Sequence, residues 1–313
     1  MRDKFFLLLM STLGLSVVAV AAPVWLLSLA TVAAGTGLVV LGLLVLWRSG
    51  LVPFGQALYF ATGAYSVALA VRAGLTTDAF LLLIIASISS GTLAAVAGCL
   101  LSRYREIFFA MLSLALSMIL YGVLVQSQYF GSTDGIHVGT ATFLTAAPTS
   151  SSYVTLLFLL AWVLTVFAAR GITWFLKSVA GNLSGLIRQN EVRIEYMRFS
   201  VGKLVHLNLI IAGVLAGAGG GLTALSIGHV DPSFAYWTTS GEFVFVTILV
   251  GTTSVPGAII GSFLFVLLRS TAMSLVPEAW QLILGSVLLL TILFMPQGIG
   301  ALVVRMFRRR VQS

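Results

Sequence analysis

Residues 31–47 read TVAAGTGLVVLGLLVLW, a run of 17 residues without a charged side chain. This length is close to what a helix needs to cross the hydrocarbon core of a bilayer. Similar runs recur along the 313 residues, of which 59% are hydrophobic and only 8% are charged. Unpaired backbone groups are not tolerated in lipid, and unbroken apolar runs differ from the alternating pattern of barrel strands. The sequence therefore predicts an all-α, polytopic transmembrane helical bundle that forms a single domain over residues 1–313.

Charged residues, Pro/Gly pairs and polar loops divide the chain into ten apolar segments. They cover residues 5–29, 31–47, 54–71, 79–101, 107–126, 153–172, 204–226, 241–252, 257–269 and 279–295. The first is too long for the apolar region of a signal peptide, so we expect it to remain attached as the first span. The segments 241–252 and 257–269 are short for a full crossing. We expect half-helices or tilted pieces that meet at the break between Gly251 and Gly257.

The distribution of Lys and Arg predicts the orientation of the bundle, because these residues collect in cytoplasmic loops. Ten crossings with both termini in the cytoplasm place 15 of the 17 basic residues on that side, and only Arg72 and Arg269 fall outside. The loops 127–152 and 227–240 contain no Lys or Arg and are predicted to be periplasmic. The net charge of +8 is therefore a sign of topology, and no basic stripe beside aromatic residues indicates nucleic-acid binding.

The longest predicted cytoplasmic connection covers about residues 173–203. Apolar residues repeat at helical spacing within it, at Leu183, Ile187, Ile194 and Met197. An adjacent charged stripe consists of Arg188, Glu191, Glu195 and Arg198. This pattern predicts one short amphipathic helix on the membrane face, with one side docked on the membrane domain and the other offered to a partner.

Small and polar residues mark candidate packing and pore positions. Gly213, Gly217 and Gly221 follow each other at four-residue spacing, which favours close helix packing and leaves movement during gating as the alternative. The same packing or gating role is assigned to Gly251, Pro256 and Gly257. The polar residues that could line a pore, or equally satisfy backbone groups, are Gln56, Gln126, Thr247, Thr252, Thr253 and Ser254.

The sequence carries no motif of a metalloprotease, serine hydrolase or dithiol enzyme and no complete P-loop. We therefore predict no catalytic residue and no resident cofactor. His137, His206 and His229 are spread over different predicted sides, so no metal site is expected. Cys99 lies in an apolar run and is expected to pack in the core. We also expect few ionisable groups deep in the membrane, with no carboxylate pair, no Asp/Glu/His chain and no isolated Lys or Arg in mid-span, which favours a pore driven by another chain, a channel or a scaffold over a proton- or sodium-coupled transporter.

Several stretches in order resemble one known family. They are SGLVPFGQA (49–57) followed by FATGAY (60–65), FGSTDGI (130–136), IRQNEVRIEYM (187–197), VDP (230–232), the Gly251 break and MPQGI (295–299). On these residues, over about 32–300, the chain resembles the permeases of branched-chain amino acid ABC importers, specifically the LivM-type partner of the LivH/LivM pair. It departs from the family pattern at Gly251-Thr252-Thr253-Ser254, where Gly-Gly-x-Gly is usual, and at Ile194 and Arg198, where Ala and Gly are usual.

The resemblance implies an ABC importer permease fold in a bacterial inner membrane. It implies a LivH-type second permease subunit, two cytoplasmic ABC ATPases that bind ATP and Mg²⁺, and a periplasmic solute-binding protein. It also implies that residues 185–198 form the helix that couples to the ATPases, with the site residues Ile187, Arg188, Asn190, Glu191, Arg193, Ile194, Glu195 and Met197. The expected solutes are branched-chain or related amino acids. Alternatives are urea or short amides carried by the same permease type, or a secondary transporter or channel without ATPases.

Overall fold

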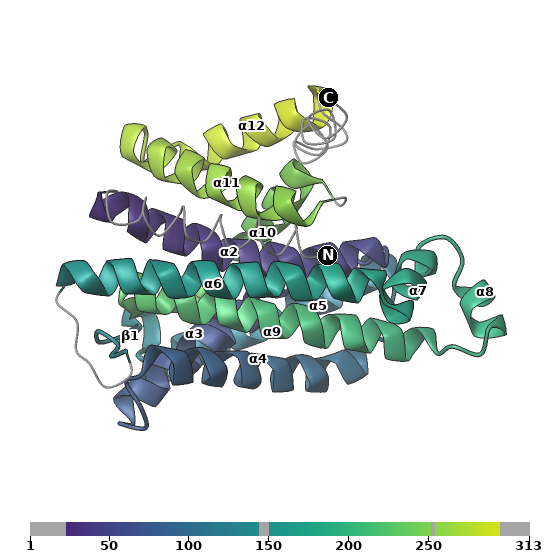
Figure 1. The fold of residues 1–313 in the computed structure, drawn as a ribbon, viewed down its shortest axis with the longest axis horizontal. Coiled ribbons are helices and arrows are strands. Elements are labelled where there is room, and N and C mark those ends of the chain that lie inside the picture. Colours follow the sequence, from purple (N-terminus) through teal and green to yellow (C-terminus); the bar gives the residue numbers. More distant parts are fainter. Residues whose placement is uncertain (1–22, 144–149, 252–253, 295–313) are drawn as a thin grey trace, which may run out of the picture.

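The computed structural model describes residues 23–143, 150–251 and 254–294. Long helices run side by side along the longest axis, with two short helices at one end and a two-stranded sheet at the other (Figure 1). The helices are α2 (Val24–Arg48), α3 (Gln56–Arg72), α4 (Ala79–Leu101), α5 (Glu106–Gln126), α6 (Ser150–Lys177), α7 (Val179–Ile187), α8 (Glu191–Tyr196), α9 (Val201–Ile227), α10 (Trp237–Val250), α11 (Val255–Leu275) and α12 (Trp280–Phe294). The remaining elements are the strands β1 (Ile136–His137) and β2 (His229–Val230) and the 3-10 turns η1 (Gln128–Phe130), η2 (Ser132–Asp134) and η3 (Pro232–Ala235).

Six of the described helices, α2, α4, α5, α6, α9 and α11, are long and apolar enough to cross a membrane. Two more, α10 and α12, are apolar but shorter. The chain is therefore a multi-pass helical membrane protein. The count of ten crossings and the cytoplasmic position of both termini stay predictions, because residues 1–22 and 295–313 lie outside the described part of the chain.

The predicted boundary between the first two segments is wrong. Helix α2 begins at Val24 and continues without a break to Arg48, so residues 24–29 belong to the second segment. Pro23 precedes the helix with extended backbone angles, as expected for a residue that lacks an N–H and disfavours helix at the position before it. The helix therefore starts at a proline that the hydropathy pattern ignores.

The predicted break between the segments 241–252 and 257–269 is present. Helix α10 ends at Gly251, whose φ of 78° is a backbone conformation that favours glycine. Helix α11 begins at Val255, where the Ser254 hydroxyl accepts the Gly257 N–H at 3.2 Å and Pro256 lies in the first turn. Two separate helices result, as the Gly/Pro composition predicts.

Helix α9 lies at the centre of the bundle and packs against α2, α3 and α4. Glycines allow these close approaches, because a Cβ on Gly217 would lie 2.5 Å from the Ala86 carbonyl oxygen and would also collide with the Ser90 side chain. A Cβ on Gly35 of α2 would lie 2.8 Å from the Gly219 carbonyl oxygen. The predicted close packing along this helix is thus backbone-to-backbone contact with three neighbours.

The two ends of the bundle differ in charge. The end with α7 and α8, called the basic end below, carries most of the described Lys and Arg residues: Arg48, Arg103, Arg105, Lys177, Arg188, Arg193, Arg198 and Lys203. At the opposite end β1 pairs antiparallel with β2, and an isolated bridge joins Asp78 to Thr142. Arg72 lies at this opposite end and donates to the Tyr129 carbonyl oxygen at 2.9 Å.

Cys99 does not pack in the core as expected. It is exposed on α4, with its sulfur 3.4 Å from the Ala95 carbonyl oxygen of its own helix. The apolar run that contains it forms an outer surface of the bundle, because α4 uses its small residues, not Cys99, to contact α9. Hydropathy alone does not separate these two faces in a membrane helix, since both are apolar.

Candidate functional site

Helix α3 begins inside the bundle, and the chain before it is not helical. Residues 49–55 reach the interior in a turn and extended conformation, and the Phe54 N–H donates to the Ser113 hydroxyl of α5 at 3.1 Å. The Ala57 N–H donates to the Ser240 hydroxyl of α10 at 2.9 Å. The first turns of α3 and α10 therefore meet, and serine hydroxyls satisfy backbone donors that lipid would leave unpaired.

The turn η3 leads into α10 from the opposite end of the bundle. The Ala235 carbonyl oxygen accepts the Ser117 hydroxyl at 2.8 Å, and Ser117 lies near the middle of α5. The Asp231 carboxylate starts this turn by accepting the Ser233 N–H at 2.7 Å. Non-helical backbone thus reaches the middle of the bundle beside the starts of α3 and α10. Interrupted helices of this kind line solute and ion sites in membrane transporters.

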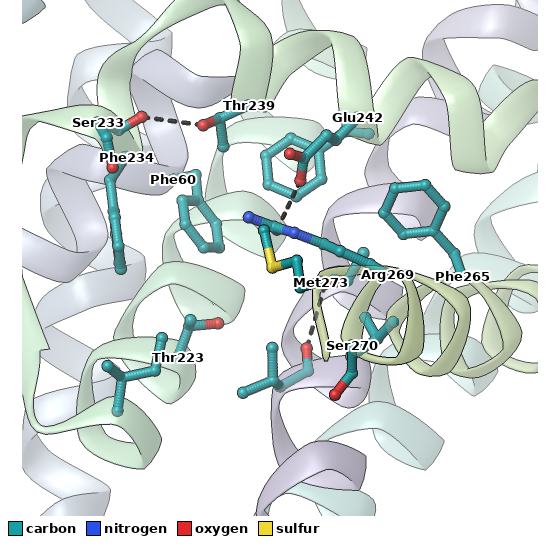
Figure 2. A pocket seen from close by; sticks show the side chains of 15 residues that line it. Phe60, Thr223, Ser233, Phe234, Thr239, Glu242, Phe265, Arg269, Ser270 and Met273 are labelled. Carbon is teal, nitrogen blue, oxygen red and sulfur yellow. Dashed lines mark hydrogen bonds and ion pairs between the residues drawn. The ribbon is translucent and has the colours of Figure 1, made fainter. Parts of the chain in front are cut away.

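A cavity of about 300 Å³ lies at this junction, between η3, α10 and α11 on one side and α2, α3 and α9 on the other. Figure 2 shows the side chains that line it. Its apolar wall comes from Val32, Phe60, Ile227, Phe234, Phe243, Phe265, Val266 and Met273. Its polar lining comes from Thr36, Thr223, Ser233, Thr239, Glu242, Arg269 and Ser270. The volume is at the small end of the range for small-molecule sites.

An ion pair stands at this cavity. Arg269 Nη1 of α11 lies 2.7 Å from Glu242 Oε2 of α10, with side-chain exposures of 40% and 14%. The guanidinium also stacks over the Trp280 ring of α12, at 5.3 Å from its centroid. The expectation of few ionisable groups deep in the membrane did not single out this pair. Arg269 was noticeable in the sequence, because it is one of the two basic residues outside the predicted cytoplasmic side. Nothing in the sequence indicated that Glu242 lies opposite Arg269.

The predicted pore residues do not gather at this cavity. Gln56 is fully buried between α3 and α9, where its amide donates to the Ala212 carbonyl oxygen at 3.1 Å. Gln126 is exposed at the end of α5. Thr247 is buried and donates to the Phe243 carbonyl oxygen of its own helix at 2.8 Å. Thr252 and Thr253 lie outside the described residues.

The predicted glycine positions fall into two groups. Gly213, Gly217 and Gly221 all face α4, where added Cβ atoms would collide with Ala94, Ser90 and Ala86. The remaining positions, Gly251, Pro256 and Gly257, form the end of α10 and the first turn of α11. The first group fixes helix packing and the second group forms the break. Gating at either group stays a prediction.

The predicted single amphipathic helix is two helices. Helix α7 ends at Ile187, and Asn190 starts α8 by accepting the Arg193 N–H on its side-chain oxygen at 3.2 Å. Arg188 and Gln189 lie in the intervening turn. The apolar spacing continues through this region, but the asparagine competes for the backbone donor and restarts the helix.

Helix α8 is held to the bundle by two contacts. Ile194 is fully buried in a core cluster with Phe109 and Val201. Glu191 Oε1 accepts from Arg105 Nε at 2.6 Å, and Arg105 also donates to the Ser102 and Tyr104 carbonyl oxygens. Three apolar side chains of this region remain exposed at the basic end: Val192 at 56%, Tyr196 at 85% and Met197 at 51%. Helix α8 therefore has an anchored side and an unpartnered apolar side.

Helix α7 is joined to the bundle by a buried polar network. Asn208 of α9 donates from its side-chain amide to the Ser49 hydroxyl at 2.8 Å and to the Ser184 hydroxyl at 3.0 Å. All three residues are buried. This network ties the end of α2, the middle of α7 and the first half of α9 together, and no pattern in the sequence predicts it.

The histidines are less scattered than predicted. His137 and His229 pair across β1 and β2, with ring centroids 6.4 Å apart. Among the described residues no group of three His, Cys, Asp or Glu side chains gathers as a metal site. Two neighbouring imidazoles alone do not complete the coordination of a structural zinc ion.

Comparison with protein families identifies most of the chain. Residues 25–293 match the family described as "Branched-chain amino acid transport system / permease component". No curated protein and no solved structure matches the chain.

Proposed function

Because the chain belongs to the family of permease components of branched-chain amino acid transport systems, we propose that it is the transmembrane subunit of an ATP-binding cassette importer for branched-chain or related amino acids. The observation that carries this proposal is the family match over residues 25–293, which includes every described helix except the ends of α2 and α12. A permease of this family is a transport subunit and not a catalytic enzyme.

Charge supports an orientation with the basic end in the cytoplasm of a bacterial inner membrane. The described part of that end concentrates Lys and Arg, as cytoplasmic loops do. The opposite end, with β1 and β2, then faces the periplasm, where a solute-binding protein would deliver its cargo. Ten crossings with both termini in the cytoplasm fit the same orientation.

The exposed side of α8 is the surface that we assign to the ATPase. Tyr196, Met197 and Val192 present apolar area at the basic end, and large exposed apolar patches in water mark interaction sites. Glu191 is paired with Arg105 within this chain, which supports a role in positioning this surface. It orients α8, and the aromatic and thioether side chains contact the motor. Two ATPases that bind ATP and Mg²⁺, and a LivH-type sister permease, complete the importer.

The Glu242–Arg269 ion pair is one observation that favours the alternative function, a secondary transporter. Buried ionisable groups in membrane helices often belong to transport pathways. Energy coupling separates the two functions. An ABC permease moves solute only with its ATPases and ATP, whereas a secondary transporter needs neither.

The first experiment measures uptake of radiolabelled leucine, isoleucine and valine in the native host with and without this gene. Loss of uptake on deletion and its recovery with the wild-type gene are expected. Tyr196→Ala should reduce uptake and the amount of ATPase that copurifies, while Val179→Ala, which is also exposed at the basic end but on α7, should change neither. Competition by urea instead of leucine would indicate the short-amide class. Uptake by this chain alone in liposomes without nucleotide would overturn the proposal.

A second experiment tests the orientation. In a Cys99→Ser background, cysteines replace Tyr196 on α8 or Tyr129 at the opposite end, both of which are exposed. A membrane-impermeant maleimide should label position 129 from the periplasm and position 196 only after the inner membrane is opened. The reverse pattern would refute the orientation and with it the assignment of α8.

A further inference from the structure

The ion pair at the cavity is incompletely satisfied by the protein. One oxygen of Glu242 and one nitrogen of Arg269 make the contact of 2.7 Å. Within the described residues no hydrogen bond reaches Glu242 Oε1 or the other guanidinium nitrogens of Arg269. A guanidinium carries five N–H donors and a carboxylate has two acceptor oxygens, so each partner can bind a further group without breaking the pair.

The charged pair lies among the residues that line the cavity. Figure 2 shows Arg269 reaching beneath Glu242 towards Phe60, with Met273 beside the guanidinium. Both charged residues line the cavity, and Glu242 is the more buried of the two. An ion pair that only joined α10 to α11 would not need to present a free oxygen and free N–H groups to a cavity.

Three of the other polar side chains of the cavity already donate their hydroxyl protons to backbone carbonyls. The hydroxyls of Thr36, Thr223 and Thr239 donate to the carbonyl oxygens of Val32, Gly219 and Ser233. A solute recognised mainly through several neutral hydrogen bonds, such as a sugar or urea, would compete with these internal bonds. The free hydrogen-bonding groups of the cavity are therefore the two opposite charges and the hydroxyls of Ser233 and Ser270, for which no hydrogen bond is found within the described residues.

Next to the charges lies an aromatic surface. The Phe60 ring lies 5.4 Å from the Phe234 ring and 5.1 Å from the Phe243 ring, measured between centroids. Burying a branched aliphatic side chain against such rings is favourable in proportion to the apolar area removed from water. The cavity thus combines one negative group, one positive group and one apolar wall, in about 300 Å³.

Building on the proposed permease function, we propose that this cavity is a binding site within the membrane domain for a zwitterionic α-amino acid with an apolar side chain. The ammonium group binds Glu242 Oε1, the carboxylate binds the unused N–H groups of Arg269, and the side chain packs on Phe60, Phe234 and Phe243. The Glu242–Arg269 pair stays closed and becomes part of a four-charge ring. The permease itself then discriminates among solutes, in addition to any binding protein.

The test is protection of a cysteine at the cavity, in membrane vesicles that hold the full transport complex without its binding protein. In a Cys99→Ser background, Ser270→Cys places a thiol at the cavity, and Ser274→Cys places one a turn further along α11, exposed and outside the cavity lining. L-leucine should slow the reaction of position 270 with a small methanethiosulfonate and leave position 274 unchanged. Leucine without its carboxylate (3-methylbutylamine) and leucine without its amine (4-methylpentanoate) should not protect at the same concentration.

The double variant Glu242→Gln/Arg269→Gln removes both charges and keeps side chains that can still hydrogen-bond to each other. It should raise the leucine concentration needed for half protection by roughly tenfold or more, as expected for loss of charge-assisted contacts to a ligand. Its reaction rate without leucine should match that of the parent, which would show that the cavity is intact.

The outcomes separate the site from the function. Protection that survives in the double variant, or equal protection by the amine or the acid, would overturn zwitterion recognition. No protection at position 270, in vesicles that take up leucine with ATP once the solute-binding protein is added back, would overturn the site and leave the importer assignment standing. Vesicles that show leucine protection but no ATP-dependent uptake, even after the solute-binding protein is added back, would retain the site and overturn the proposed function.

Discussion

Replacing Gly217 with Ala tests the close packing around α9. A Cβ at this position would lie 2.5 Å from the Ala86 carbonyl oxygen and 2.8 Å from the Ser90 hydroxyl, and it would collide with the Ser90 Cβ. None of these atoms is the far end of a flexible side chain. Helix α4 must therefore move away from α9 to accommodate a single methyl group.

The displacement also disturbs hydrogen bonds. The Ser90 hydroxyl lies 2.7 Å from the Gly213 carbonyl oxygen and 3.0 Å from that of Tyr59. Overpacking costs about 1–3 kcal/mol, and a lost hydrogen bond costs about 1 kcal/mol more. Alanine recovers at most about 1 kcal/mol through its higher helix propensity. With the full alanine gain, the expected net loss in the free energy of unfolding is roughly 1–3 kcal/mol.

The assay is reversible unfolding in mixed micelles by sodium dodecyl sulfate, followed by far-UV circular dichroism. Gly122→Ala is the matched control, because it lies within α5 and a Cβ there would meet no atom within 4 Å. We expect Gly122→Ala to leave stability unchanged or raise it slightly. Equal stability of the two variants would refute the claim that backbone contact around α9 determines the packing.

Three other perturbations give defined outcomes. Asn208→Leu should lower the free energy of unfolding by about 1–3 kcal/mol in the same assay, because it removes the buried bonds to Ser49 and Ser184; an unchanged value would mean that the network contributes nothing. Glu191→Ala should reduce copurification of the ATPases while changing the free energy of unfolding by less than about 1 kcal/mol, as for a partly exposed ion pair. Undiminished copurification would contradict the role of Glu191 in holding α8 in place. In a Cys99→Ser background, Gly37→Cys with Ser262→Cys should form a disulfide, since a Cβ at Gly37 lies 3.7 Å from the Ser262 Cβ. Uptake should stop on oxidation and return on reduction. Uptake that persists in the oxidised protein would show that α2 and α11 need not move apart.

The sequence predicts those features of the fold that depend on composition along a single helix. The apolar segments, the Gly251 break and the close-packed face of α9 follow from hydropathy, Gly/Pro chemistry and small-residue spacing. Boundaries that depend on one capping residue were missed, as Pro23 and Asn190 show. Periodicity does not record whether a short polar side chain bonds its own backbone and restarts a helix.

The ion pair at the cavity could not be predicted from the sequence, for a different reason. Glu242 and Arg269 are 27 residues apart and belong to two helices whose mutual rotation depends on packing. Each lies near the end of an apolar run, where a charge is ordinarily read as facing water. Gln56 shows the opposite error, since a polar residue in an apolar helix suggested a pore but instead bonds the backbone of a neighbouring helix. Pairing between elements is information that one sequence does not contain.

The arrangement of contacts limits where the bundle can move. Helices α2, α3, α4 and α9 meet through glycines at backbone distance, and α7 and α8 pack on α2, α6 and α9 at the basic end. The contact of α11 with α2 at Gly37 has ordinary van der Waals spacing, and Gly251 separates α10 from α11. The cavity lies between these two groups, with Glu242 and Arg269 on one wall and Phe60 on the other. A displacement transmitted through α8 would therefore change the distance between the charges and Phe60 while leaving the ion pair itself intact, because both charged residues belong to the same wall, as do Phe234 of η3 and Phe243 of α10.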